Sequence, residues 1–262
     1  MNPKVSIAII NDIAQAAGRA IMEVYHHADF SQVVNFKDDD SPLTLADQAS
    51  HRVIAPALQQ HYPNIPLISE EGKEIDYATR RQWEHFWLVD PLDGTKEFIK
   101  RNGQFTVNIA LIHHHRPVLG VIYTPATDEL YFATQAGYAD DLEAGGYKQT
   151  AGGAVETLRV RQPPEKRVAV RSSSHASEEE EQVLKQHNVT ESIARGSSLK
   201  FCMVAEGKAD IYYRHGPTME WDTAAGQAIV EAAGGKVVQE TSDRPFTYNK
   251  ESLRNGSFLV ST

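Results

Sequence analysis

The sequence predicts an α+β fold in which helices cover two sheets. An amphipathic helix opens the chain, three strand-like runs between Phe105 and Thr134 indicate an antiparallel meander, and helical and strand-like segments alternate after residue 165. The chain has 262 residues. At about 100–200 residues per domain, this length allows one large domain or two modest ones, with a core that needs no disulfides.

The first part of the chain predicts two helices and two buried strands. Apolar residues recur at helical spacing over residues 9–24, which predicts an amphipathic helix. A second helix is expected to begin near Ser41 and Pro42, an N-cap followed by a first-turn proline. Short apolar runs at residues 65–69 and 86–90 indicate buried strands, and each ends in carboxylates.

A meander is expected next. Its strands are FTVNIALIH, PVLGVIY and ELYFAT, separated by turn residues at Arg116-Pro117 and at residues 125–128. A Gly-rich stretch, residues 144–153, then closes this half of the chain. The sequence Gln162-Pro163-Pro164 marks a subdomain boundary near residue 165.

We therefore expect an N-terminal α+β subdomain, residues 1–165, that contains the antiparallel sheet. A C-terminal α/β subdomain, residues 166–262, is expected to follow. Its predicted elements are strand RVAVRS, an acidic helix from about Ser177, a helix over residues 199–206, strand DIYYR, a helix over residues 222–233, and strands KVVQ and SFLVST.

Charge and composition exclude several classes of protein. The 26 Lys and Arg residues against 35 Asp and Glu residues give a net charge of −9, so a nucleic-acid partner is not expected. The single cysteine, Cys202, cannot form an intrachain disulfide, which fits a reducing compartment. The chain contains no apolar run of about 18–20 residues, and its opening segment lacks a basic leader with a cleavage site. We expect a cytoplasmic protein.

Three apolar segments end abruptly in acidic residues: LISEEG (67–72), WLVDPLDGT (87–95) and EWDTAAG (220–226). A carboxylate at the end of a buried strand is costly unless a cation meets it. Lys and Arg are absent from these segments. Mg²⁺ prefers oxygen ligands, so the pattern predicts a divalent-cation site.

The middle segment adds a geometric argument. Asp90 and Asp93 flank a Pro-Leu corner, which can turn both carboxylates and the Leu92 carbonyl toward one point. Gly94 and Thr95 then present backbone N–H groups, and a helix start, to an anion. The sequence therefore predicts that metal and phosphate meet at this corner.

Asp222 has a competing explanation, because aspartate is favoured as the N-cap of a helix. Taken alone, the N-cap is the better interpretation; beside the other two acidic segments, we favour a ligand role.

Other chemistries fit less well. Phosphatases with an aspartate nucleophile place it two residues before Asp-Gly-Thr, where this chain has Pro91. The G-x-x-x-x-G-K-[ST] and G-x-S-x-G motifs are absent from the sequence. The histidine run 113–115 suggests a transition metal, but consecutive strand residues point to opposite faces, so an exposed hairpin corner is the preferred interpretation.

Jointly and in this order, the three segments resemble the E-E, D-P-[ILV]-D-G-T and W-D-x-A-[AG]-G motifs of the lithium-sensitive, Mg²⁺-dependent phosphatases related to inositol monophosphatase. Within that superfamily the chain is similar to bacterial 3′(2′),5′-bisphosphate nucleotidases, through SPLTLADQAS, WLVDPLDGTKEFIKRNGQFTVNIALI, GSSLKFCMVAEGKAD and GPTMEWDTAAG. The similarity covers essentially the whole chain. It implies a layered αβαβα sandwich with the site between its two halves.

The resemblance implies two or three Mg²⁺ ions. Glu70, Asp90 and the Leu92 carbonyl would bind the first ion, and Asp90, Asp93 and Asp222 the second. A third, weaker ion would use Glu70 and water molecules. Two ions neutralise the four ligand carboxylates, and a third matches an incoming phosphate dianion.

The resemblance also implies an activity: hydrolysis of the 3′-phosphate of adenosine 3′,5′-bisphosphate to AMP and phosphate, inhibited by Li⁺ and linked to sulfur assimilation and nucleotide recycling. Thr95, hydrogen-bonded to Asp47, would orient and help deprotonate the attacking water, with Glu70 as a third catalytic residue. The substrate contacts would be Gly94, Thr95, His175, Ser197, Lys200, Arg214 and Asp222.

Alternatives stay open at this stage. Lys200 could be a solvated helix residue, and Arg214 could pair with an acid such as Glu220. The substrate could be an inositol phosphate or fructose 1,6-bisphosphate, and the chain could be a Mg²⁺-dependent binding module or an interaction protein. Some relatives are described as peripheral on the cytoplasmic face of the inner membrane, although no basic amphipathic helix favours this here. The sequence does not predict the oligomeric state.

Overall fold

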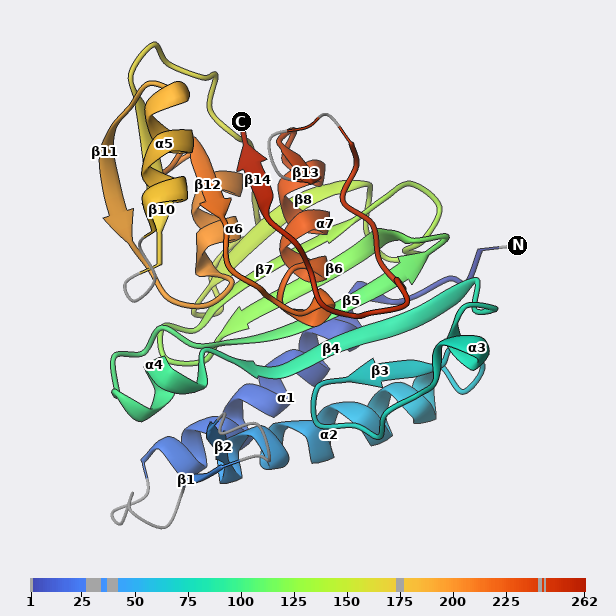
Figure 1. Ribbon diagram of the computed structural model, residues 1–262. Helices are drawn as coiled ribbons and strands as arrows, with labels where there is room; N and C mark the ends of the chain where they lie inside the picture. The colour runs from blue at the N-terminus through green and yellow to red at the C-terminus, as the bar shows by residue number, and fades with distance from the viewer. Residues whose placement is uncertain (1, 27–33, 37–41, 173–176, 240–241, 243) are drawn as a thin grey trace.

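The computed structural model describes residues 2–26, 34–36, 42–172, 177–239, 242 and 244–262. Two large sheets alternate with three layers of helices (Figure 1). The layers are α1 with α2, a seven-stranded sheet, α6 with α7, a five-stranded sheet, and α5. This is the predicted αβαβα sandwich.

Helices α1 (Ile7–Tyr25) and α2 (Leu45–His61) pack against each other and against one face of the seven-stranded sheet (Figure 1). The predicted first helix is confirmed. Its apolar stripe is buried, and the Ser6 side chain accepts a hydrogen bond from the Ile9 N–H, which caps the helix. Next to α2, strands β1 (Val34–Phe36) and β2 (Pro42–Thr44) form a small antiparallel pair.

The predicted start of the second helix is wrong. Pro42 lies in β2, and α2 begins at Leu45 because Thr44 caps it. The Thr44 hydroxyl accepts from the N–H groups of Ala46 and Asp47, while the Asp47 carboxylate accepts from the Thr44 N–H at 2.7 Å. This capping box fixes the orientation of Asp47.

The seven-stranded sheet has the order β3-β4-β5-β6-β7-β8-β9. Strands β3 and β4 are parallel and the other pairs are antiparallel, so the predicted meander is confirmed. Helix α3 (Tyr77–Arg80) lies between β3 and β4 along the chain. The strands are β3 (Leu67–Ser69), β4 (His85–Asp93), β5 (Thr106–His113), β6 (Arg116–Thr124), β7 (Glu129–Thr134), β8 (Gly145–Thr150) and β9 (Glu156–Thr157).

Two details of this sheet differ from the prediction. Arg116 and Pro117 belong to β6, and the turn lies at His114 and His115, whose φ angles are 43° and 66°. The Gly-rich stretch 144–153, for which no strand was expected, contains β8. Its glycines allow this strand to lie under α7: a Cβ atom on Gly146 would come within 3.3 Å of a helix carbonyl.

The five-stranded sheet has the order β11-β10-β12-β14-β13. Strand β10 is parallel to β11 and β12, and β14 is antiparallel to its two neighbours. Helix α5 (Glu178–Gln186) packs on the outer face through Leu184. The strands are β10 (Arg167–Arg171), β11 (Val189–Ala194), β12 (Ile211–Arg214), β13 (Lys236–Gln239) and β14 (Phe258–Ser261).

Helices α6 (Leu199–Ala205) and α7 (Ala224–Ala232) fill the space between the two sheets. Close packing here depends on glycine: a Cβ atom on Gly120 in β6 would lie 2.6 Å from the Ala225 carbonyl. The chain passes from one sheet to the other between Thr157 and Arg167. In the described part of the chain, none of the helices is long and apolar enough to span a membrane.

Candidate active site

The acidic corner of β4 is a β-bulge. The strand was expected to end at Asp90, but it continues to Asp93, with Asp90 paired to Asn108 and Asp93 paired to Thr106. Two residues therefore separate the aspartates on β4 where one residue separates their partners on β5. Residues three apart in a regular strand point to opposite faces, and the extra residue brings both carboxylates toward the same side.

The bulge is anchored from the helix layer. Ser50, a buried residue of α2, donates from its hydroxyl to the Pro91 carbonyl at 2.6 Å. The Leu92 N–H donates to Asp90 Oδ1 at 3.0 Å. These two contacts hold the corner between the sheet and α2.

The predicted ligand acids come close enough to repel one another. Burial raises the pKa of Asp90 well above its ordinary value, and the nearby charges of Glu70, Asp93, Asp222 and Asp47 raise it further. Burial also raises the pKa of Asp222, together with the charges of Asp93 and Glu70. The three acidic segments therefore converge in space.

Asp93 is held by hydrogen-bond donors from two other elements. Its Oδ2 atom accepts from Ser198 Oγ at 2.7 Å and from Asn108 Nδ2 at 3.4 Å. Ser198 Oγ also lies 3.0 Å from the Asp222 carbonyl oxygen. Ser198 thus joins the segment of Asp93 to the segment of Asp222.

The donor set fits a divalent cation. Among the described residues, Asp90, Asp93 and Asp222 form no ion pair with a lysine or arginine, although Asp90 is only 2% exposed. Several buried carboxylates without a cationic partner are energetically costly. Mg²⁺ takes oxygen ligands and would neutralise these charges.

Asp222 is not the N-cap of α7. It ends a short 3₁₀ helix, Glu220–Asp222, and α7 begins at Ala224. The Asp222 side chain accepts from the Met219 N–H at 2.8 Å. The carboxylate is therefore held within its own turn, next to Asp93.

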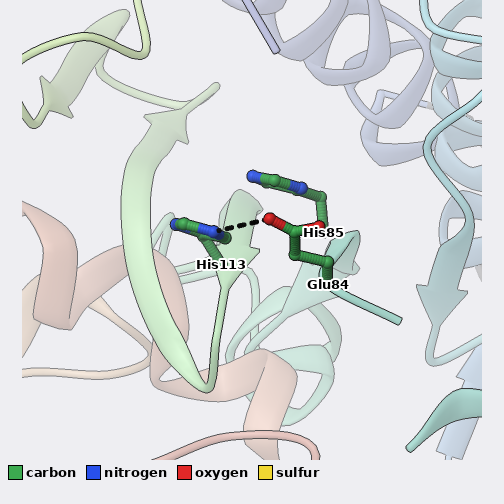
Figure 2. A group of neighbouring side chains, drawn as sticks. All are labelled: Glu84, His85 and His113. Atoms are coloured by element: carbon green, nitrogen blue, oxygen red, sulfur yellow. Dashed lines mark hydrogen bonds and ion pairs between the residues drawn. The ribbon is translucent and has the colours of Figure 1, made fainter. Parts of the chain in front are cut away.

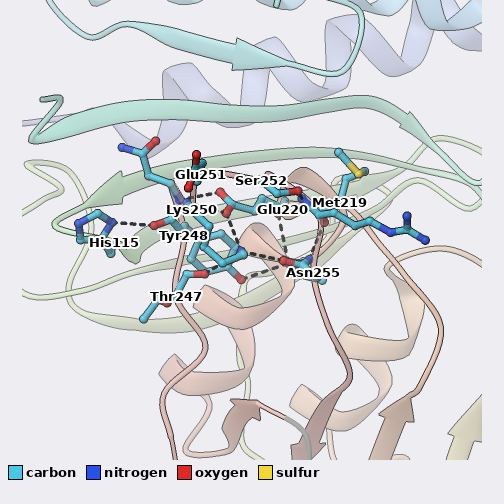
Figure 3. Close-up of polar contacts among 12 residues, drawn as sticks. His115, Met219, Glu220, Thr247, Tyr248, Lys250, Glu251, Ser252 and Asn255 are labelled. Atoms are coloured by element: carbon cyan, nitrogen blue, oxygen red, sulfur yellow. Dashed lines mark hydrogen bonds and ion pairs between the residues drawn. The ribbon is translucent and has the colours of Figure 1, made fainter. Parts of the chain in front are cut away.

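A buried network fixes the turn of Asp222 (Figure 3). Glu220 is fully buried and accepts from the backbone N–H groups of Asn249 (2.7 Å) and Lys250 (3.0 Å), and from Lys250 Nζ (2.6 Å). Asn255 Nδ2 donates to the Met219 carbonyl at 2.8 Å. The cationic partner of Glu220 is thus Lys250, so the alternative that pairs Glu220 with Arg214 is wrong.

Asp47 and Thr95 lie together as expected. Thr95 Oγ1 donates to Asp47 Oδ1 at 3.4 Å, while Asp47 Oδ2 accepts from Thr44. Burial raises the pKa of Asp47 to about 6, although the hydrogen bonds from Thr44 oppose this shift. Asp47 is thereby positioned by the cap of α2, and it connects that helix to the acidic corner.

Position 94, directly after Asp93, requires glycine. Gly94 has a φ angle of 95° and precedes α4 (Thr95–Ile99). A Cβ atom on Gly94 would lie 3.0 Å from the Gln104 carbonyl oxygen and 3.1 Å from Ser197 Cβ. The left-handed turn at Gly94 therefore lets the 196–198 segment approach the corner of β4.

A cavity of about 170 Å³ joins the acids to the predicted substrate-binding residues. Asp93 and Asp222 line it on one side. Its other lining residues include Gly94, Ser197, Lys200 and Arg214. Four residues expected to contact the substrate, from the turn before α4, the loop before α6, α6 and β12, thus surround one space beside the acids.

Lys200 is not a solvated helix residue. It is 6% exposed, its Nζ atom donates to the Ser197 carbonyl at 2.6 Å, and it lies 5.3 Å above the ring centre of Tyr212. Burial lowers the pKa of Lys200 to about 8, although the charge of Asp93 opposes the shift. Arg214 Nε is buried and has no hydrogen-bond partner in the described part of the protein. His175 lies outside the described residues.

Sequence reasoning missed the residues that support the ligands. Ser198, Asn108 and Ser50 hold the corner of β4, and Lys250 neutralises Glu220. Ser198 follows a predicted substrate residue and was the easiest of these to find. Nothing in the local sequence marks Asn108 or Lys250.

The sequence matches the inositol monophosphatase family over residues 3–259, and the chain belongs to this family. Mg²⁺ dependence is typical of its members. Among curated proteins, the chain is 47% identical over 250 residues to the 3′(2′),5′-bisphosphate nucleotidase CysQ of Escherichia coli O157:H7, covering 95% of this chain and 96% of that protein. The corresponding protein of Haemophilus influenzae is 34% identical over 255 residues, covering 95% and 89%.

Solved structures of similar fold support the same family assignment. The crystal structure of CysQ from Bacteroides thetaiotaomicron has a TM-score of 0.83 at 44% identity, covering 98% of this chain and 96% of that one. The suhB protein from Bartonella henselae has a TM-score of 0.77 at 26% identity, covering 98% and 93%. The family and fold implied by the three acidic segments are therefore confirmed.

Proposed function

We propose that this protein is a Mg²⁺-dependent phosphatase that hydrolyses adenosine 3′,5′-bisphosphate at the 3′-phosphate to give AMP and phosphate. One observation carries the proposal: a single cavity is lined on one side by the half-buried carboxylates of Asp93 and Asp222, which form no ion pair with a described lysine or arginine, and on the other by Lys200 and Arg214. Relatives at up to 47% identity bear the name 3′(2′),5′-bisphosphate nucleotidase. The substrate has two phosphates. The acidic side of the cavity would bind one of them through metal ions, and the side with Lys200 and Arg214 would bind the other directly.

The acidic side would hold the metal ions. Glu70, Asp90 and the Leu92 carbonyl would bind one Mg²⁺, and Asp90, Asp93 and Asp222 a second, with a third, weaker ion at Glu70. Mg²⁺ bound here would neutralise charge on the 3′-phosphate and lower the pKa of a water molecule. The fit rests on the burial of Asp90 and on the repulsion among these carboxylates.

Thr95 and Asp47 would position the attacking water and take up its proton. Thr95 Oγ1 donates to Asp47 Oδ1, so its lone pairs can accept a proton from water as its own proton moves to Asp47. The pKa of about 6 suits Asp47 to receive that proton near neutrality. The water would attack phosphorus in line with the departing 3′-oxygen, and a second proton from solvent would complete AMP.

Lys200, Arg214, Ser197 and the nearby backbone would bind the 5′-phosphate. Burial removes the Lys200 ammonium group from water, and its hydrogen bonds go to the neutral carbonyls of Arg195 and Ser197. A bound anion would therefore supply the negative charge that this cation lacks. The Arg214 Nε donor is buried without a partner among the described residues. A second phosphate would supply acceptors to both cations. His175, expected in the same role, stays a prediction.

Phosphate release from three substrates tests the proposal. We expect the enzyme to prefer adenosine 3′,5′-bisphosphate over inositol 1-phosphate and fructose 1,6-bisphosphate, to require Mg²⁺, and to be inhibited by Li⁺ and Ca²⁺. Preference for inositol 1-phosphate would overturn the substrate assignment. Release at an unchanged rate in a chelator would overturn the metal assignment.

A variant of Lys200 tests whether the cationic side of the cavity binds the nucleotide while the acidic side performs the hydrolysis. Lys200→Met should raise KM for the bisphosphate nucleotide by on the order of 10–100-fold, the effect of one lost charged contact, and leave hydrolysis of inositol 1-phosphate nearly constant. Lys208→Met is the matched control, because Lys208 Nζ pairs with Glu206 and is exposed outside this cavity. Equal losses on both substrates would contradict the assignment of Lys200.

A further inference from the structure

A second cluster of potential metal ligands lies at the other end of β4 from the acidic corner. It consists of Glu84, His85 and His113 (Figure 2). His85 begins β4, His113 ends β5, and the two residues are paired across the antiparallel sheet. His85 and Asp90 are five positions apart on the strand, which is about 17 Å. The cluster is therefore separate from the cavity described above.

The three side chains lie close together. The His85 and His113 rings are nearly parallel, with 2° between their planes and 4.1 Å between their centres. Glu84 Oε1 lies 3.3 Å from His113 Nε2, beside both rings (Figure 2). One potential ligand atom from each residue lies within 4.8 Å of the other two.

Each of the two histidines has a feature that is typical of a metal ligand. His85 Nε2 is buried and has no hydrogen-bond partner within the described residues. Burial lowers the pKa of His85 and the proximity of His113 lowers it further, although the charge of Glu84 opposes this shift, so the neutral imidazole with its lone pair is favoured. His113 Nδ1 contacts the Tyr138 hydroxyl. Metal-binding histidines are commonly oriented in this way by a partner on the second ring nitrogen.

We propose that Glu84, His85 and His113 form a binding site for Zn²⁺ or a similar borderline transition metal, completed by water. Two imidazoles and one carboxylate suit Zn²⁺, whereas Mg²⁺ prefers oxygen ligands throughout. Imidazole lone pairs lie in the ring plane, so the parallel rings must turn for both nitrogens to face one ion. The Glu84 oxygen already lies at His113 Nε2, and the ion takes the place of that hydrogen bond.

The site links the start of β4 to the end of β5. The histidine run 113–115 is not the ligand set: His114 and His115 form the turn, and His115 Nδ1 contacts the Tyr248 carbonyl at 2.7 Å. The second imidazole comes from the neighbouring strand instead. His113 is also more buried than the exposed hairpin corner expected from the sequence, with 17% of its side chain exposed.

Calorimetric titration of Zn²⁺ into the protein, with saturating Mg²⁺ present, tests the site. We expect one Zn²⁺ per chain, a rise in Tm of roughly 5–10 °C at 100-fold excess over Kd, and at least a 10-fold weaker Kd for His85→Gln, His113→Gln and Glu84→Gln. His61→Gln is the matched control, an exposed histidine at the end of α2. Asp93→Asn should retain the Zn²⁺ site.

Three results would overturn the proposal: no saturable binding to the wild type, unchanged binding to His85→Gln, or loss of binding in Asp93→Asn. Glu84 is exposed, so Glu84→Gln gives a variant with minimal risk to folding. Wild-type Mg²⁺-dependent phosphate release and an unchanged melting curve without Zn²⁺ verify that the variants of Glu84, His85, His113 and His61 are folded. A cooperative melting transition without Zn²⁺ verifies folding for Asp93→Asn, whose activity is expected to be low.

Discussion

Asp90 and Glu220 are both buried carboxylates, each within three residues of an acid that lines the cavity, but their surroundings are opposite. Glu220 accepts hydrogen bonds from two backbone N–H groups and from Lys250 Nζ. Within the described part of the chain, Asp90 accepts from the Leu92 N–H alone and is repelled by four other acids. A buried acid with matched donors stabilises the fold, whereas a buried acid without them indicates a site for a cation.

Asp210 extends the comparison. Burial alone would raise the pKa of this carboxyl, but hydrogen bonds from Arg161 and from the Val168 N–H outweigh burial and lower the pKa. The pKa values of Asp90 and Asp222 move in the other direction. The sign of the shift thus distinguishes the structural acid Asp210 from Asp90 and Asp222, two of the acids that we assign to metal.

The largest expected effect is that of Asp90→Asn. The amide is isosteric and its oxygen can still accept from the Leu92 N–H, but it removes a ligand shared by two proposed Mg²⁺ ions. We expect kcat to fall by on the order of 10³-fold, and by on the order of 10²-fold for Asp93→Asn, at limiting Mg²⁺.

The same Asp90→Asn variant should be more stable than the wild type when both are metal-free, by about 1–3 kcal/mol, because one repelled charge is gone. Chemical denaturation in a chelator measures this difference. Wild-type turnover, or lower stability without metal, would contradict the assignment of Asp90.

Glu220→Gln should have the opposite effect on stability. The amide keeps one acceptor oxygen, but it removes the charge that pairs with Lys250 and turns an NH₂ donor toward a group that donated to Glu220, and we expect a loss of about 2–4 kcal/mol in the free energy of unfolding. Chemical denaturation with and without Mg²⁺ is the measurement. A stabilising effect in the chelator would remove the distinction between the two buried acids.

The pH dependence of stability should also differ in sign. The pKa of Asp210 is lowered in the folded state, so its contribution is complete above the unfolded value of about 3.9 and is lost as pH falls through the folded pKa. The pKa of Asp90 is raised, so the metal-free protein should lose stability as pH rises from about 4 through that raised pKa.

Melting curves over pH compare the two groups directly. Asp210→Asn should flatten the loss of stability at acid pH, and Asp90→Asn should flatten the loss on the alkaline side in a chelator. Saturating Mg²⁺ should abolish the second loss in the wild type. An identical pH profile with and without Mg²⁺ would be inconsistent with cations at Asp90.

The smallest effect is expected for Ser50→Ala, which removes the hydrogen bond to the Pro91 carbonyl. We expect a loss of about 0.5–1.5 kcal/mol in stability and a several-fold decrease in kcat, since the bulge is less firmly held. Ser252→Ala, at an exposed position, is a control. A large loss of stability without loss of activity would show that Ser50 supports α2 alone.

The acids of the site could be predicted from the sequence because each of them follows an apolar run within a few residues. Such a pattern is local and is visible without the structure. The predicted α2 start failed because Thr44 with Asp47 makes a better cap than Ser41 with Pro42. Contacts over long separations could not be predicted: Lys250 meets Glu220 from 30 residues away, and His85 meets His113 through strand register. The bulge at Asp90 depends on pairing with β5, which the local sequence does not specify.

Mn²⁺ binding measured by electron paramagnetic resonance tests the central claim most directly, because Mn²⁺ accepts the same oxygen ligands as Mg²⁺. We predict at least two Mn²⁺ ions per chain for the wild type and for Glu220→Gln, competed by Mg²⁺, and the loss of at least one ion in Asp90→Asn. Equal Mn²⁺ binding by the wild type and Asp90→Asn would contradict the account.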